Sequence, residues 1–117
     1  MERRSYPRVK VSCPVLYTTH TYPCPRVVTA TDLSLGGTRI EKGYYLTKSA
    51  KIQVSIVIPS HVIKCKGNVM YILLLKNGRL IAGVQFERLS AHDKRHLGQY
   101  ISYIMSENRA GGSLNRG

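Results

Sequence analysis

Short stretches of β-branched and alternating apolar residues, separated by glycine, proline and asparagine, occupy most of this chain. The clearest is 51–56, where polar and apolar side chains alternate with the period of two that is typical of a half-buried strand. Asn77-Gly78 is the strongest hairpin-turn dipeptide in the chain. We therefore expect strands at 9–17, 27–33, 38–40, 51–56, 62–72 and 80–86. Many short strands between turns predict a mainly β domain, either a barrel or a sandwich.

Two of these strands should be irregular. Pro14 has no amide proton to donate, so the first strand is expected to lie at a sheet edge or to contain a bulge. The fifth is long enough to bend, and Gly67 is the expected position of the bend. The order of the strands cannot be deduced from these signals.

The periodicity changes near the end of the chain. Ser90 precedes Asp93 by three residues, which resembles a helix capping box with aspartate in place of glutamate or glutamine. Apolar residues then recur at helical spacing on one face, at Leu97, Tyr100, Ile101, Ile104 and Met105. We expect a helix that lies against the sheet and closes one end of it. The segment 108–117 consists mainly of glycine, asparagine and arginine, cannot pack and is predicted to be a disordered tail.

With 117 residues the chain is long enough for one domain with a real core, and its net charge is +12. Such a charge attracts anions: nucleic acid, an acidic membrane surface or a charged small ligand. Five scattered lysines are interpreted as solvated surface (Lys48, Lys51, Lys64, Lys66 and Lys76). Arg3, Arg4 and Arg8 lie close together beside Lys10, and this cluster indicates a binding function.

The three cysteines, Cys13, Cys24 and Cys65, are odd in number and lack a Cys-x-x-Cys spacing, which favours reduced thiols. No secretory apolar region follows the charged start of the chain. The longest apolar run, 69–75, is far shorter than the roughly 20 residues of a transmembrane helix. We therefore expect a cytoplasmic protein without membrane insertion.

Two motifs carry the functional prediction. Arg4 and Arg8 form Arg-x-x-x-Arg, and Asp32, Ser34 and Gly37 form Asp-x-Ser-x-x-Gly. Two guanidinium groups can grip phosphates and the O6/N7 edge of guanine with paired hydrogen bonds. The second motif adds a carboxylate, a hydroxyl and a glycine that permits close approach to the backbone. This combination suits a nucleotide ligand.

The two motifs, in this order and separation, resemble those of the PilZ domain family, bacterial receptors for the second messenger cyclic di-GMP. Gly83-Val84-Gln85-Phe86 matches the Gly-Val-x-Phe segment of the family's last barrel strand, and the likeness runs from about Arg3 to Ile104. The resemblance implies a six-stranded antiparallel β-barrel with a C-terminal helix packed on it. It further implies three segments: a flexible basic arm at 1–8, the barrel and helix at 9–107, and a disordered tail at 108–117.

The resemblance also implies site residues. Arg4 and Arg8 would hold the ligand, and Arg3 would accompany binding of a stacked ligand dimer. The Asp32 carboxylate would accept hydrogen bonds from the N–H groups of a guanine edge or hold an arginine in place. Ser34 would hydrogen-bond the ligand, and Gly37 would leave room for it. Tyr71 and Arg39 are left outside this set, because a strand aromatic is usually core and a strand arginine is often solvated.

The predicted function is a non-enzymatic receptor that relays ligand binding to an unidentified protein effector by ordering its arm. No catalytic group with a matched base is visible, and no cofactor is expected. His92 and His96 have the spacing of metal-ligating histidines on a helix, but no third ligand is evident, so no metal is predicted. The alternatives are a basic β-barrel that binds single-stranded nucleic acid, with few aromatics to support it, and a PilZ-like module without ligand binding.

Overall fold

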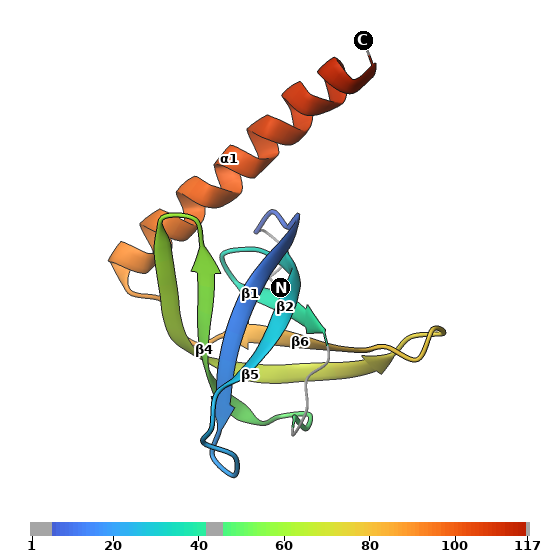
Figure 1. Ribbon diagram of the computed structural model, residues 1–117. Coiled ribbons are helices and arrows are strands. Elements are labelled where there is room, and N and C mark those ends of the chain that lie inside the picture. Colours follow the sequence, from blue (N-terminus) through green and yellow to red (C-terminus); the bar gives the residue numbers. More distant parts are fainter. Residues whose placement is uncertain (1–5, 42–45, 117) are drawn as a thin grey trace.

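The computed structural model describes residues 6–41 and 46–116, and side chains as far as Arg109. The described elements are β1 (Val9–Thr19), β2 (Arg26–Leu33), β3 (Gly37–Glu41), β4 (Lys51–Ile58), β5 (His61–Leu74), β6 (Leu80–Phe86) and α1 (Ala91–Arg116). The strands form a closed antiparallel barrel in the order β1-β2-β3-β6-β5-β4, with α1 over one end (Figure 1). The predicted barrel with a C-terminal helix is confirmed.

Alternation of side chains explains the barrel's core. In β4 the apolar residues at every second position are buried, and the residues between them are exposed or half-buried. The other strands contribute in the same way, because successive side chains of a strand point to opposite faces of the sheet. The largest fully buried side chains are Tyr17, Leu33, Ile40, Ile56, Ile63, Leu97, Val15 and Val69. One of them, Leu97, comes from α1, so the helix contributes to the core of the barrel.

The two expected irregularities are both present in altered form. β1 pairs with β2 on one side and β4 on the other, so it is not an edge strand, but pairing with β4 begins at Val15 and Pro14 pairs with β2 alone. The pairing of β1 with β2 shifts register between Lys10 and Cys13, directly before Pro14, so the bulge is confirmed. In β5, pairing with β4 ends at Asn68 and pairing with β6 begins at Gly67. The glycine therefore marks the point where β5 changes partners.

Asn77-Gly78 lies in the hairpin that joins β5 to β6, as predicted. Gly78 has a φ of 85°, a left-handed conformation that glycine adopts without strain. The amide of Arg79 donates to the side-chain oxygen of Asn77 at 3.0 Å, and the amide of Leu75 donates to the carbonyl of Arg79 at 2.8 Å. The loop is longer than a two-residue turn, since β5 ends at Leu74 and β6 begins at Leu80.

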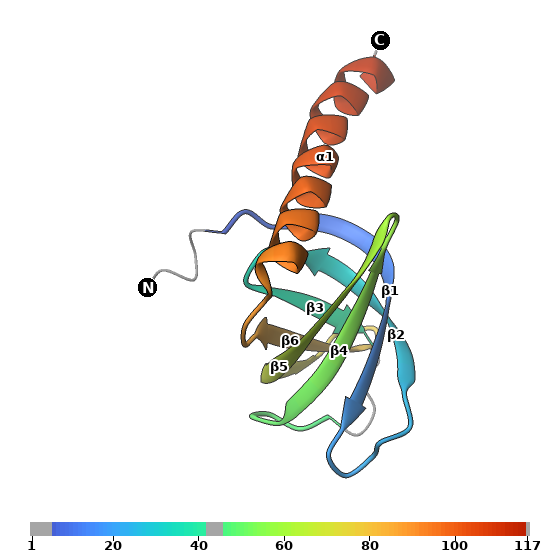
Figure 2. The same cartoon turned by 90° about the vertical axis from the view of Figure 1, so that its left-hand side faces the viewer.

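The start of α1 is capped by Ser90, whose hydroxyl accepts from the amide of Asp93 at 3.0 Å. Leu97 and Ile101 are buried, and Tyr100, Ile104 and Met105 pack half-buried against the core, so the predicted apolar face is present. The C-terminal part of the helix projects away from the barrel (Figure 1, Figure 2). The helical backbone continues to Arg116, beyond the bounds of 9–107 expected for the barrel and helix. Disorder of 108–117 in solution stays a prediction.

Candidate ligand-binding site

The turn from Asp32 to Gly37 connects β2 to β3 and is closed by its own serine. The amide of Ser34 donates to the carbonyl of Gly37 at 2.9 Å. The hydroxyl of Ser34 accepts from the amides of Gly36 and Gly37 at 3.1 and 3.2 Å. Ser34 is 3% exposed. A serine that satisfies buried amides in this way fixes the turn, because an unpaired buried amide is costly. Its predicted hydrogen bond to a ligand is not tested by this geometry.

Gly37 is required by the sheet itself. It pairs with Gln85 of β6, and a Cβ built at position 37 would overlap the backbone carbonyl oxygen of Val84. The space beside Gly37 is therefore occupied by the neighbouring strand, which changes the interpretation that this glycine leaves room for a ligand. Its neighbour Gly36 lies against the arm instead, where an added Cβ would come within 2.9 Å of the Tyr6 ring.

Asp32 lies at the end of β2 and holds arginines from two directions. Its Oδ1 accepts a hydrogen bond from Nη1 of Arg8 at 3.1 Å, and its Oδ2 lies 3.8 Å from Nε of Arg39. The Arg8 side chain is 53% exposed, whereas that of Asp32 is 10% exposed. One of the two roles proposed for Asp32, holding an arginine in place, is therefore seen for Arg8. Arg3 and Arg4 lie outside the described residues.

Arg39 and Tyr71, which the predicted site omitted, extend this network. Nε of Arg39 donates to the hydroxyl of Tyr71 at 3.1 Å, and this hydrogen bond raises the pKa of Arg39 above its ordinary value. The Tyr71 ring covers Gly83 of β6, where a Cβ would overlap it. Arg39 pairs directly with Asp32 across the β2–β3 hairpin. The tight turn between the two strands was the signal that could have placed Arg39 beside Asp32.

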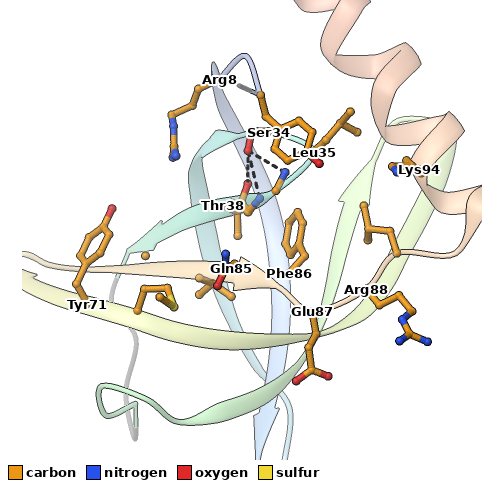
Figure 3. Close-up of a pocket in the computed structure, with 17 residues that line it drawn as sticks. Arg8, Ser34, Leu35, Thr38, Tyr71, Gln85, Phe86, Glu87, Arg88 and Lys94 are labelled. Carbon is orange, nitrogen blue, oxygen red and sulfur yellow. Dashed lines mark hydrogen bonds between the residues drawn. The ribbon is translucent and has the colours of Figure 1, made fainter. Parts of the chain in front are cut away.

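A cavity of about 740 Å³ opens beside this turn. Figure 3 shows Arg8 and Tyr71 on one side of it and Arg88 and Lys94 on the other. Its remaining lining comes mainly from the turn, β6 and the segment between β6 and the helix: Tyr6, Ser34, Leu35, Gly36, Gly37, Thr38, Met70, Gly83, Val84, Gln85, Phe86, Glu87 and Leu89. Volumes of roughly 300–1,000 Å³ are usual for small-molecule sites.

The cavity favours an anion with an aromatic part. Arg8, Arg88 and Lys94 are cationic, and Glu87 is the one acid in the lining. Glu87 is paired with Lys51 at 3.1 Å, and this hydrogen bond lowers the pKa of its carboxyl. The aromatic rings of Tyr6, Tyr71 and Phe86 add surfaces for contact with a base. Charge and aromatic surface together fit a nucleotide.

A second cluster lies between the barrel and the helix. His61 of β5 stacks on His96 with ring centroids 4.0 Å apart, and His92 meets both rings edge-on. Burial, with the charges of His61 and His92, lowers the pKa of His96. His61 is the third histidine that the sequence did not reveal, because it is distant in the chain from the helical pair.

The cysteines and the helix give two further observations. Cys13, Cys24 and Cys65 are all free, in agreement with the expected reduced thiols. Burial raises the pKa of Cys13, and burial with the nearby Asp93 charge raises the pKa of Cys65 to about 11.

Within the described part of the chain, the helix is not apolar enough over a sufficient length to span a bilayer.

Comparison with known proteins agrees with this geometry. A family model described as the PilZ domain matches residues 2–103, and the chain therefore belongs to the PilZ domain family. Among curated protein sequences none matches significantly.

Solved structures share the fold. The PilZ domain of YcgR from Escherichia coli, solved with c-di-GMP, has a TM-score of 0.73 and 18% identity; the match covers 96% of this chain and 98% of that one. MotI (DgrA), an inhibitor of motility from Bacillus subtilis, has a TM-score of 0.79 and 17% identity over 93% of this chain. The MrkH–c-di-GMP complex of K. pneumonia has a TM-score of 0.75 and 15% identity over 93% of this chain. This chain spans 54% of each of the last two structures, about half of their length.

Proposed function

We propose that this domain is a non-enzymatic cytoplasmic receptor for cyclic di-GMP. Membership of the PilZ family and the likeness to domains solved with c-di-GMP support this proposal. The observation that carries it is the position of Arg8, held by the carboxylate of Asp32 at a basic cavity. An arginine fixed in this way presents its remaining N–H groups to a ligand at a reduced cost in side-chain entropy.

Each part of the site has a role in this proposal. Arg8 grips a phosphate or a guanine edge with charge-assisted hydrogen bonds. Arg88 and Lys94 attract the anion from the other side of the cavity. Tyr71, positioned by Arg39 and by its contact with Gly83, offers a ring on which a base stacks. The turn of Ser34 and Gly37 holds Asp32 and β6 in the geometry that makes these contacts possible.

The arm relays the signal in this proposal. Arg3 and Arg4 precede Tyr6, the first described residue, by only a few positions. A ligand bound by Arg8 would recruit these two arginines and order the segment 1–8 over the cavity. Ordering costs conformational entropy, which the charge-assisted contacts must offset. The ordered arm would then present a new surface to a protein effector, a population shift driven by ligand affinity.

Isothermal titration calorimetry with cyclic di-GMP tests the receptor proposal. GMP and GTP serve as nucleotide controls, and Arg109→Ala serves as a matched control because Arg109 is exposed on α1 and does not line the cavity. We expect saturable binding of cyclic di-GMP that Arg8→Ala weakens and Arg109→Ala preserves. Absence of binding at millimolar ligand, with circular dichroism showing a folded barrel, would refute the proposal.

The same titration gives the number of ligands bound per chain, and a titration with an oligonucleotide tests the competing class of ligand. Two ligands per chain are expected if Arg3 supports a stacked dimer, and one ligand per chain excludes it. The +12 charge makes single-stranded nucleic acid the competing ligand. Its affinity would fall steeply with salt, because many phosphates release counterions. Tight binding of an oligonucleotide without any response to cyclic di-GMP would favour the nucleic-acid function.

A further inference from the structure

Three of the four histidines of this chain converge between the barrel and the helix. His61 is the first residue of β5, directly after the turn that follows β4, and His92 and His96 are one helical turn apart on α1. One ring nitrogen from each histidine lies within 4.8 Å of the corresponding nitrogens of the other two. Three potential nitrogen ligands from two separate elements therefore lie close together.

The neighbouring carboxylate orients one of these rings. Nε2 of His61 lies 2.7 Å from Oδ1 of Asp93, and the amide of Lys64 donates to the other carboxylate oxygen at 3.4 Å. A deprotonated carboxylate can only accept, so the proton of this contact belongs to His61, and in the neutral ring its Nδ1 carries the lone pair. Metal-ligating histidines usually donate their second nitrogen to a carboxylate in this manner.

The capping serine explains why Asp93 is available for this contact. In a complete capping box the acidic side chain would return to the backbone of the cap residue. Here Ser90 caps the amide of Asp93, and the carboxylate points to β5 instead. An anion beside three imidazoles compensates for Arg95 and Lys94 on the same helix.

We propose that His61, His92 and His96 form a binding site for a divalent transition-metal ion, Zn²⁺ in particular. Three imidazoles with an open fourth position are a coordination set that Zn²⁺ accepts. Because His61 comes from the barrel and the other two from α1, the ion would join the helix to the β4–β5 hairpin. Asp93 is the positioning residue that fixes the tautomer of His61.

Metal binding requires a small adjustment of the rings. Tetrahedral coordination at 2.0–2.1 Å separates the ligand nitrogens by roughly 3.3 Å, so they must approach one another from their present positions. The stacked rings of His61 and His96, whose planes differ by 7°, must tilt apart so that each directs a lone pair at one ion. Rotation about the side-chain torsions achieves this, since His92 is exposed and His96 only half-buried.

The test is a titration of the full chain with Zn²⁺ and with Co²⁺ in chelator-free buffer that contains a non-coordinating reductant. We expect one ion per chain, and a Co²⁺ absorption spectrum of tetrahedral type without the charge-transfer band of a thiolate ligand. His61→Ala, His92→Ala and His96→Ala should each weaken binding at least tenfold. Asp93→Asn should weaken it about tenfold, as the loss of an outer-shell partner does.

His20→Ala is the matched control, because His20 is exposed in the loop after β1 and lies outside the cluster. Cys24→Ser removes the exposed thiol as a competing ligand. Circular dichroism confirms that each variant is folded. Unchanged affinity in His92→Ala and His96→Ala, or binding that is lost with Cys24→Ser, would overturn the site.

Hydrogen exchange tests the connection between helix and barrel. Amides in the first turns of α1 should exchange at least fivefold more slowly with Zn²⁺ than without it, and His20→Ala should behave as the unchanged chain does. The His61→Ala variant should lose this protection, because it retains both helical ligands but removes the one from the barrel. Metal binding without added protection in α1 would refute the connection.

Discussion

The arm and the turn that meet at Asp32 differ in how their polar groups are used. In the turn, the hydroxyl of Ser34 and the glycine at 37 are both committed to the fold, one to buried amides and the other to the approach of β6. In the arm, Arg8 makes one ion pair with the described residues, and its side chain is half-exposed. The two motifs look equally functional in the sequence but differ in the structure: Ser34 and Gly37 are committed to the fold, whereas the guanidinium of Arg8 is half-exposed.

Gly37→Val should have the largest effect, because Gly37 is committed to the packing of β3 against β6. A valine Cβ would overlap the carbonyl of Val84, and the backbone of β6 cannot move as a flexible side chain does. We expect a loss of about 3 kcal/mol or more in the free energy of unfolding. Urea denaturation measures this loss. A folded Gly37→Val variant of normal stability would show that the backbone can accommodate a side chain at position 37, which contradicts this role of Gly37.

Ser34→Ala should destabilise the domain by about 1–3 kcal/mol, because the buried amide of Gly37 and the part-buried amide of Gly36 lose their acceptor. Urea denaturation again gives the loss, with Ser55→Ala in the middle of β4 as a control for a serine that is only half-buried. Affinity for cyclic di-GMP should fall only as far as the turn is disturbed. A large loss of affinity at unchanged stability would mean that the hydroxyl serves the ligand directly.

Arg8→Ala should show the opposite pattern to Ser34→Ala. A charge-assisted contact contributes roughly 1.5–3 kcal/mol, so affinity for cyclic di-GMP should fall at least tenfold. Stability should change by less than about 1 kcal/mol, since half-exposed ion pairs contribute little. Arg4→Ala should weaken binding to a similar degree. Calorimetry and urea denaturation measured on the same samples separate the two effects, and normal affinity in both variants would refute the arginine site.

Order in the arm gives a finer version of the comparison. NMR relaxation should show higher order parameters from Tyr6 to Val9 when ligand is bound, with little change in the barrel strands. Binding should weaken with salt less steeply than binding of a nucleic-acid duplex, because few charges are neutralised. An arm with the same order in the free and bound protein would contradict the relay.

The smallest expected effect is a change in the alkylation rate of Cys65. This residue lies in β5, so its rate depends on the barrel and not on the arm. Its raised pKa, about 11, keeps the thiol protonated at neutral pH, so its alkylation rate should rise about tenfold per pH unit between pH 8 and 10. The same shift contributes stability that is fully present below the unfolded-state pKa and is lost as the pH rises towards 11. Mass spectrometry of alkylated protein should show less than a twofold change in Arg8→Ala and faster reaction in Ser34→Ala.

The strands were predictable because their side chains alternate and their turns carry glycine or asparagine. The helix start was predictable from Ser90, whereas its end was not, because the polar residues after 107 give no periodic signal although the backbone remains helical. The closed order of the barrel came from the family resemblance and not from the residues themselves.

At the site, local spacing identified Asp32, Ser34 and Gly37 but not what each side chain contacts. The reason is that Val84, which fills the space beside Gly37, belongs to a strand far along the chain. His61 escaped notice for the same reason, since only the packing of α1 on β5 brings it to His92 and His96. Contacts between distant segments are set by the tertiary structure, which a single sequence does not display.

Arg39, the second arginine beside Asp32, matters when the Arg8–Asp32 ion pair is lost. A buried carboxylate that loses its only cation is left uncompensated, at a cost of roughly 3–5 kcal/mol. Arg39 remains near Asp32 when Arg8 is replaced, since it is held on β3 and by Tyr71. The Asp32 carboxylate therefore keeps a cation beside it in Arg8→Ala, which agrees with the small loss of stability expected for that variant. In Arg39→Ala the same carboxylate depends on the half-exposed Arg8 alone.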